Sequence, residues 1–326
     1  MKRISLAFLL MLFQGVLFAQ LTFSDQLHVR AAKQLNDRFG EEIWEGIAKV
    51  PFSLLLVTDS GEFLMFHENP SEEFVEVDHE KMITGKVWYR PSVFRNNLLA
   101  TFPAVGGQSC IVVGTPKNTG LNSNRWVTTL LHEHFHQMQQ GDSTYYADVA
   151  NLDLDGGDDT GMWMLNYPFP YDDSAVNAKF DAFKLSLLNL LESKGLDLTE
   201  DYLAARKAFE QGLSEKDYAY FSFQVWQEGI ARYTEYQFLE SVKQFIEGLG
   251  VTSLSSFDDY LQIRELLYAK MLENLKSQSL LEDQRLCFYT IGFAEGLVLD
   301  RLNPDWKELY LKEKFFIEKY LDANVK

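Results

Sequence analysis

The sequence predicts an α+β protein in which an N-terminal sheet lobe is followed by a mainly helical lobe. Residues 53–115 contain short runs rich in β-branched and aromatic residues, separated by turn sequences such as Asp59-Ser60-Gly61. From about residue 174 onwards, apolar residues recur at the three- and four-residue spacing of amphipathic helices. We therefore expect residues 20–121 to form a lobe with a helix and a sheet, and residues 122–326 to form the helical lobe.

The N-terminus has the composition of a secretory signal peptide over residues 1–19. Lys2 and Arg3 precede an apolar run, and cleavage is expected after Ala19. The apolar run is shorter than the ~20 residues that a membrane-spanning helix needs. Because Leu17 is large for its place before the cleavage point, an uncleaved N-terminal anchor is the alternative. We expect an exported protein, periplasmic or extracellular, that is soluble after cleavage.

The predicted elements follow the two-lobe division. Residues 24–50 have a helical period and are expected to form one helix that breaks near Gly40. Strands are expected at residues 53–58, 62–67, 74–77, 86–89, 98–102 and 109–115. Helices are expected at residues 126–137, 184–194, 199–211, 215–246, 256–277, 282–302 and 304–321.

The charge of the chain excludes two classes of partner. The sequence has 47 acidic residues against 30 basic ones and a formal net charge of −17. Loss of the signal peptide would make the mature chain more acidic still, since residues 1–19 contain basic residues and no acid. Nucleic acids and anionic membranes would be repelled. We expect neither as a partner, and no oligomeric state is predicted.

The helix expected at residues 126–137 lies where the two lobes meet and contains His132, Glu133 and His136. Two residues four apart in a helix are separated by only about 40° around its axis, so both histidines leave the same face. Glu133 projects close to that face, where a carboxylate can reach a water held by a metal. This His-Glu-x-x-His pattern is typical of zinc hydrolases.

The rest of this helix has the pattern of a buried element. Asn122, Ser123 and Asn124 are candidate N-caps. His134 points into the apolar stripe on the opposite side, so we expect a hydrogen-bonded core histidine and not a metal ligand. The stripe consists of Val127, Leu130, Leu131, Phe135 and Met138.

A third zinc ligand has to come from outside this motif, and no histidine follows His136. Asp142 has the spacing of the third ligand in some short-loop zinc proteases, but Gln139 stands where those enzymes need a glycine for the chain reversal. Glu228 is the stronger candidate, in the sequence Trp-Gln-Glu-Gly-Ile-Ala-Arg-Tyr-Thr-Glu that ends at Glu235. The alternative is that both glutamates form the wet edge of an amphipathic helix.

These two segments together resemble the gluzincins, zinc peptidases related to thermolysin and aminopeptidase N. In that family a second helix with a W-x-x-E-G-x-A-x-Y-x-E-like segment supplies a glutamate ligand; the spacing here is shorter on the tryptophan side. The resemblance implies a zincin-like fold with its active site at the lobe junction, and one zinc ion held by His132, His136 and Glu228. Glu235 matches a carboxylate that orients a ligand histidine.

A third segment agrees with this family in its order along the chain. The sequence from Tyr289 to Gly292 resembles the Y-x-x-G of aminopeptidase N relatives, whose tyrosine hydroxyl supports the transition-state oxyanion. The resemblance implies a catalytic role for Tyr289, and simple packing is the alternative.

Two departures from the family limit the activity that is expected. The separation of His136 and Glu228 is far longer than in aminopeptidase N. The G-x-M-E-N segment that holds a free amino terminus is absent, and residues 102–107 in the comparable region carry no carboxylate. An endopeptidase or a specialised hydrolase is therefore favoured over an aminopeptidase.

The expected function is that of an exported zinc metallopeptidase with Glu133 as general base. Its peptide or protein substrate would lie extended along an edge of the sheet, with residues 109–115 as the expected edge strand. One alternative is a non-catalytic zinc-binding or ligand-binding exoprotein with a zincin fold, although a structural zinc site has no use for Glu133. Another is a zinc hydrolase that acts on a non-peptide bond.

The loop at residues 151–159 has the first half of a calcium-binding pattern. A closing glutamate is missing, because Met162 occupies its position, and we expect a solvated acidic loop in preference to a Ca²⁺ site. The matching residues are Asn151, Asp153, Asp155 and Gly156.

The two cysteines, Cys110 and Cys287, are compatible with one disulfide in an oxidising compartment and equally with two buried free thiols. The sequence favours neither.

Overall fold

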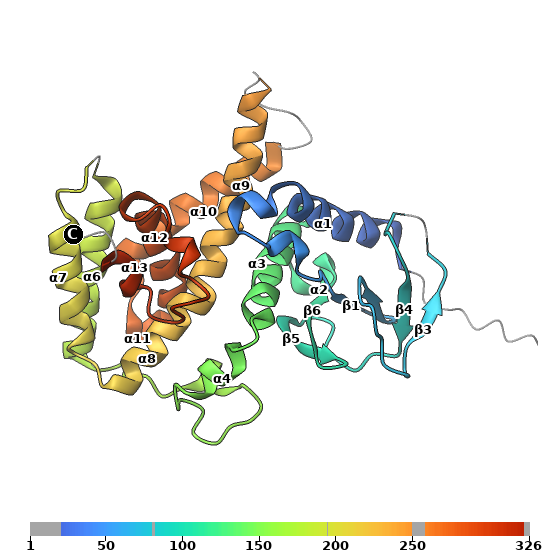
Figure 1. The fold of residues 1–326 in the computed structure, drawn as a ribbon, viewed down its shortest axis with the longest axis horizontal. Coiled ribbons are helices and arrows are strands. Elements are labelled where there is room, and N and C mark those ends of the chain that lie inside the picture. The colour runs from blue at the N-terminus through green and yellow to red at the C-terminus, as the bar shows by residue number, and fades with distance from the viewer. Residues whose placement is uncertain (1–20, 80–81, 194, 250–257, 323–326) are drawn as a thin grey trace, which may run out of the picture.

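The computed structural model describes residues 21–79, 82–193, 195–249 and 258–322. A sheet lobe and a helical lobe lie side by side, and helix α3 (Ser123–Gly141) runs between them (Figure 1). The predicted α+β class is therefore confirmed. The expected signal peptide lies outside the described residues. Within the described part of the chain, the helices are too short or too polar to cross a membrane.

The sheet lobe contains all six predicted strands. Their order across the sheet is β3-β4-β2-β1-β6-β5, and only β1 and β6 pair in parallel. The strands are β1 (Leu54–Thr58), β2 (Gly61–Met65), β3 (Val75–Val77), β4 (Val87–Arg90), β5 (Leu99–Val105) and β6 (Gln108–Gly114). The prediction of an edge strand at residues 109–115 is wrong, because β6 pairs with β1 on one side and with β5 on the other. The edge strand at this end of the sheet is β5.

Alternation along the strands buries both faces of the sheet. Leu54 and Leu56 of β1 join the main core, which is shared with α1 (Phe23–Ile43) and α3. Leu55 and Val57 pack into a smaller cluster on the opposite face, together with Trp88 and other partly buried side chains. The sheet is thus fixed on one face against the helix that carries the histidines.

Helix α1 differs from its prediction. It starts at the N-cap Thr22, passes through Gly40 without a break and ends at Ile43, and a short 3₁₀ turn, η1 (Ile47–Lys49), follows. A β-carbon on Gly40 would lie 2.6 Å from Asn36 Oδ1 and 2.9 Å from Ile47 Cγ2. The glycine therefore serves to let the chain fold back onto the helix, and does not interrupt it.

The helical lobe agrees with the prediction in most of its elements. The helices that form or border it are α2 (Pro116–Thr119), α4 (Tyr145–Ala150), α5 (Trp163–Asn166), α6 (Ser174–Glu192), α7 (Thr199–Glu210), α8 (Glu215–Gln224), α9 (Ile230–Gly248), α10 (Asp258–Ser277), α11 (Leu280–Asp283), α12 (Leu286–Leu302) and α13 (Glu318–Asp322). A π-helical turn, η2 (Val225–Gly229), joins α8 to α9. Helix α6 begins ten residues before its predicted start, because Asp173 caps it there by accepting from the backbone N–H of Ala175 and Val176.

The predicted helix at residues 304–321 is wrong. That segment forms a 3₁₀ turn, η3 (Trp306–Glu308), then irregular turns in which Phe315 has a φ of 72°, and then α13. The buried aromatic rings of this segment each have their own place in the core. Tyr310, for example, stacks on Trp226 with ring centroids 4.6 Å apart. The spacing of these buried aromatic residues therefore resembles that of a helix, although the segment consists mostly of turns.

The cysteines are two buried free thiols. Cys110 lies on β6 in the sheet lobe and Cys287 on α12 in the helical lobe. The free-thiol alternative is the one that the structure has.

Candidate metal centre

Helix α3 presents both motif histidines on one face. Asn122 caps the helix by accepting from the backbone N–H of Arg125, at 2.9 Å. The predicted core position of His134 is confirmed: the side chain is fully buried, and burial lowers the pKa of its ring to about 4. His134 is therefore neutral near pH 7 and takes no part in the site.

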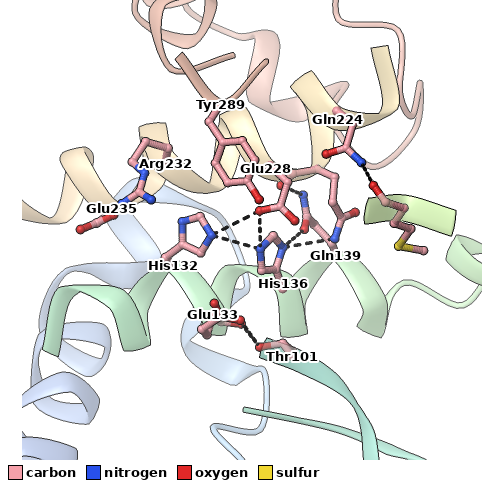
Figure 2. A network of polar contacts seen from close by, with 12 residues as sticks. Thr101, His132, Glu133, His136, Gln139, Gln224, Glu228, Arg232, Glu235 and Tyr289 are labelled. Atoms are coloured by element: carbon pink, nitrogen blue, oxygen red, sulfur yellow. Dashed lines mark hydrogen bonds and ion pairs between the residues drawn. The ribbon is translucent and has the colours of Figure 1, made fainter. Parts of the chain in front are cut away.

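Three side chains from two helical segments converge at one point. Nε2 of His132 and Nε2 of His136 are 3.2 Å apart, and Oε2 of Glu228 lies 3.6 Å and 3.5 Å from them. Figure 2 shows the two imidazoles pointing from α3 towards the Glu228 carboxylate. Within the part of the chain that the structure describes, this is the one group of three residues placed to hold a metal ion.

These distances fit a tetrahedral zinc ion. Bonds of about 2.0–2.1 Å from zinc to nitrogen or oxygen place neighbouring ligand atoms of a tetrahedron about 3.3–3.4 Å apart. All three observed separations lie within a few tenths of an ångström of that value. The histidines are buried, whereas the Glu228 side chain is 22% exposed. Solvent therefore reaches the site at the Glu228 side chain.

The orientation of His136 is fixed by Gln139, one turn further along α3. The Nδ1–H of His136 donates to Oε1 of Gln139 at 2.6 Å. The Gln139 amide is itself anchored, since its Nε2 donates to the hydroxyl of Tyr310 at 2.7 Å and to the carbonyl of Gln227 at 3.1 Å. Nε2 of His136 is therefore the ring nitrogen that faces the site.

Glu228 occupies an unusual backbone segment. It lies in the π-helical turn η2. Such turns are rare in proteins as a whole, and those that occur are often found at functional sites. The turn is packed directly on α12: a β-carbon on Gly229 would lie 2.4 Å from Cα of Gly292, and one on Gly292 would lie 2.5 Å from Cα of Gly229. Contact of backbone with backbone at this point holds Glu228 and the start of α12 together.

Tyr289 reaches the site because of this contact, being one turn before Gly292 on α12. Its hydroxyl accepts a hydrogen bond from Nη1 of Arg285 at 2.8 Å and faces the Glu228 carboxylate. Burial and the Glu228 carboxylate raise the pKa of the phenol, so the hydroxyl keeps its proton near pH 7. In Figure 2 this hydroxyl lies beside the Glu228 carboxylate.

Glu133 lies beside the two histidines and is held by the sheet lobe. The hydroxyl of Thr101 on the edge strand β5 lies 2.7 Å from Oε2 of Glu133 and 3.0 Å from its backbone carbonyl (Figure 2). The amide of Gln140 also bonds to the carbonyl of Thr101, at 2.9 Å. The edge strand β5 and helix α3 are thus joined at Glu133, the residue that was predicted to act as the general base.

Glu235 is fully buried near the site but does not bond to either histidine. Its Oε1 accepts from Nη1 of Arg125 at 2.8 Å and from the hydroxyl of Thr128 at 2.9 Å, and Oε2 pairs with Arg232. Although burial opposes its charge, the two arginines lower the pKa of Glu235 to about 2. The expected hydrogen bond from a ligand histidine to this carboxylate is therefore not formed, and Glu235 instead ties α3 to α9.

In the absence of a metal, the site holds a proton on His136. Burial opposes the charged imidazolium, but the neighbouring Glu228 and Glu133 carboxylates outweigh it and raise the pKa of His136 to about 9. Burial opposes the charge of the Glu228 carboxylate as well. The attraction of His136, and after it that of His132, nevertheless holds the pKa of Glu228 well below its usual range. A cation that binds here replaces a proton and meets a carboxylate already charged.

The other predicted candidates lie outside the cluster. Asp142 is the C-cap of α3, and its carboxylate pairs with Lys314 at 2.9 Å. In the loop after α4, Asp153 is exposed and pairs with Lys216 at 2.6 Å. Asp155 accepts from the backbone N–H of Gly157 at 2.8 Å, which stabilises the loop itself.

Three supporting residues were missed by sequence reasoning. Gln139 stands three residues after His136 on the same helix, so its spacing was a usable signal. Arg285 likewise stands one turn before Tyr289. Thr101 had no such signal, because its contact with Glu133 joins a strand to a helix far along the chain.

No protein-family model matches this chain, and no curated protein or solved structure matches it significantly. The interpretation of the site therefore depends on the residues of this chain alone.

Proposed function

We propose that this protein is an exported zinc metallopeptidase of the gluzincin type. The observation that carries the proposal is the triangle of His132, His136 and Glu228, whose ligand atoms are spaced as tetrahedral zinc requires, with Glu133 next to it. The signal-like N-terminus supports export. Zinc in this position would polarise the scissile carbonyl and lower the pKa of a water molecule towards ~7.

The side chains around the triangle have the roles that peptide hydrolysis needs. Glu133 accepts the proton of the attacking water and passes it to the leaving amine. The hydroxyl of Thr101 keeps the Glu133 carboxylate in place. Tyr289, which keeps its proton, donates a hydrogen bond to the oxyanion as the tetrahedral intermediate forms.

The edge strand β5 is the surface along which an extended substrate would bind. Its outer edge carries no partner strand among the described residues, and Thr101 in its centre already touches Glu133. A peptide that adds a strand to this edge would have its backbone beside the metal site. This replaces the expectation of binding at residues 109–115.

Glu133 favours a catalytic protein over a non-catalytic zinc-binding one. A structural zinc site is closed by four protein ligands, whereas here three ligands leave one position open beside a buried carboxylate that is not a ligand. An enzyme that hydrolyses a non-peptide bond would use the same arrangement, so the test must identify the bond that is broken.

The test is incubation of the zinc-loaded protein with a mixed peptide library, with cleavage sites read by mass spectrometry. We expect cleavage that a chelator abolishes and added zinc restores. The Glu133→Gln variant keeps the shape of the side chain but cannot accept the proton, so it should keep its zinc and lose about a hundredfold or more in turnover. No cleavage of any peptide by zinc-loaded protein, or near-normal cleavage by Glu133→Gln, would contradict the proposal.

A further inference from the structure

Arg285 places a guanidinium group next to the candidate metal ligand. It is the N-cap residue of α12, one turn before Tyr289, and is partly exposed. Its Nη1 donates to the Tyr289 hydroxyl at 2.8 Å, and its guanidinium carbon lies 5.6 Å from the centre of the Tyr289 ring. Since the same hydroxyl lies beside the Glu228 carboxylate (Figure 2), Arg285 is also within electrostatic range of that carboxylate.

Arg285 differs from the other arginines near the site because it forms no direct ion pair with a carboxylate. Arg125 and Arg232 both pair with the buried Glu235. For Arg285, the described part of the chain provides no carboxylate oxygen within the 4.0 Å of an ion pair. The carboxylate that acts on Arg285 is that of Glu228, the candidate metal ligand, and no direct ion pair joins the two.

The surroundings of Arg285 strengthen an electrostatic interaction with a ligand. Tyr171, which precedes α6, and Tyr220 on α8 lie within electrostatic range of the guanidinium, which is itself partly buried. The residue before Arg285 has a strained backbone: Gln284 has φ 48° and ψ −131°. This conformation, uncommon for a residue other than glycine, fixes the direction in which Arg285 leaves the turn between α11 and α12.

We propose that Arg285 binds a carboxylate group of the substrate on the helical-lobe side of the metal site. A guanidinium offers two parallel N–H donors that match a carboxylate, and Arg285 uses one nitrogen on Tyr289 and has the others available. The substrates are then peptides with a carboxylate close to the scissile bond, either their own C-terminus or an aspartate or glutamate side chain. This inference rests on the proposed function, since it assigns a specificity to the same site.

The experiment measures binding of three synthetic dipeptide hydroxamates, which chelate zinc, to the zinc-loaded protein by calorimetry. The first has a free C-terminal carboxylate, the second a carboxamide at the same place, and the third a carboxamide with a glutamate side chain. We expect one of the carboxylate compounds to bind about ten- to a hundredfold more tightly than the uncharged compound, as a charge-assisted hydrogen bond implies. Which of the two binds identifies the source of the carboxylate.

Variants assign this preference to Arg285. The Arg285→Gln variant should bind all three compounds with similar affinity, and Arg285→Lys should keep part of the preference because it keeps the charge. Arg95, an exposed arginine in the sheet lobe, is the matched control, and Arg95→Gln should behave as wild type. Because Arg285 also bonds to Tyr289, the ratio between charged and uncharged compounds is the quantity to compare, and not the absolute affinity.

Equal binding of all three compounds to wild type, or an unchanged preference in Arg285→Gln, would overturn the assignment. Failure of this inference and failure of the proposed function give different results. Peptide cleavage without a preference for a carboxylate would reject the inference alone. A preference without peptide cleavage would support the carboxylate site and reject the peptidase.

Discussion

Replacing Gly292 by alanine should disrupt the candidate metal centre without changing any of the residues proposed as ligands. The new β-carbon would lie 2.5 Å from both Cα of Gly229 and the carbonyl oxygen of Val225, where ordinary contacts begin at 3.4 Å. Both neighbours are backbone atoms, so no side-chain rotation can relieve the clash. The π-helical turn and α12 would have to separate by about 1 Å, an overpacking that costs about 1–3 kcal/mol of folding stability.

The same separation moves Glu228 relative to Tyr289 and the histidines. Metal sites tolerate shifts of only about 0.2 Å in their ligand distances, so zinc affinity should fall at least about tenfold. The assays are thermal unfolding and competition for zinc with a chromogenic chelator. Gly141→Ala is the matched control, because it is also a helical glycine and a β-carbon there meets nothing within 4 Å. A Gly292→Ala variant with wild-type melting temperature and zinc affinity would show that this backbone contact does not position Glu228.

Three further predictions concern the groups around the site. Tyr289→Phe should lower kcat by about two to three orders of magnitude with little change in KM, zinc content or melting temperature, and a kcat within about twofold of wild type would assign Tyr289 to packing. Thr101→Val should keep the zinc but lower kcat measurably, because the Glu133 carboxylate loses its 2.7 Å partner; unchanged kinetics would exclude this positioning role. The pKa of His136 is raised to about 9, so below that pH a zinc ion must displace a proton from this histidine. Zinc affinity should therefore rise about tenfold per pH unit between about pH 7 and pH 8.5. Chelator competition across this range tests the slope, and a constant affinity would contradict it.

Local patterns in the sequence predicted much of the fold and the main residues of the site. The six strands follow from β-branched runs between turns, and the convergence of His132 and His136 follows from helical geometry alone. Glu228 was reached through a resemblance in a short segment, and the structure places its carboxylate beside both histidines. Its spacing from Trp226 departs from the family pattern within the π-helical turn itself.

Features that depend on distant contacts were not predictable in this way. The position of β6 inside the sheet depends on its parallel pairing with β1, in which paired residues are 57 positions apart in the chain, and no local period reveals such a pairing. The aromatic segment after Asn303 has a helix-like spacing because each ring fills a separate place in the core. The contacts of Thr101 with Glu133, and of Arg125 with Glu235, likewise join elements whose sequences carry no mark of the partner.

The zinc content of the purified protein, measured side by side with that of two variants, tests whether His132, His136 and Glu228 hold a metal ion. We expect one zinc ion per chain in wild type, a similar content in Asp142→Ala, and almost none in Glu228→Ala, because of these two carboxylates it is that of Glu228 that lies beside both histidines. Full zinc content in Glu228→Ala, or loss of zinc in Asp142→Ala with retention in Glu228→Ala, would contradict the assignment of the metal centre.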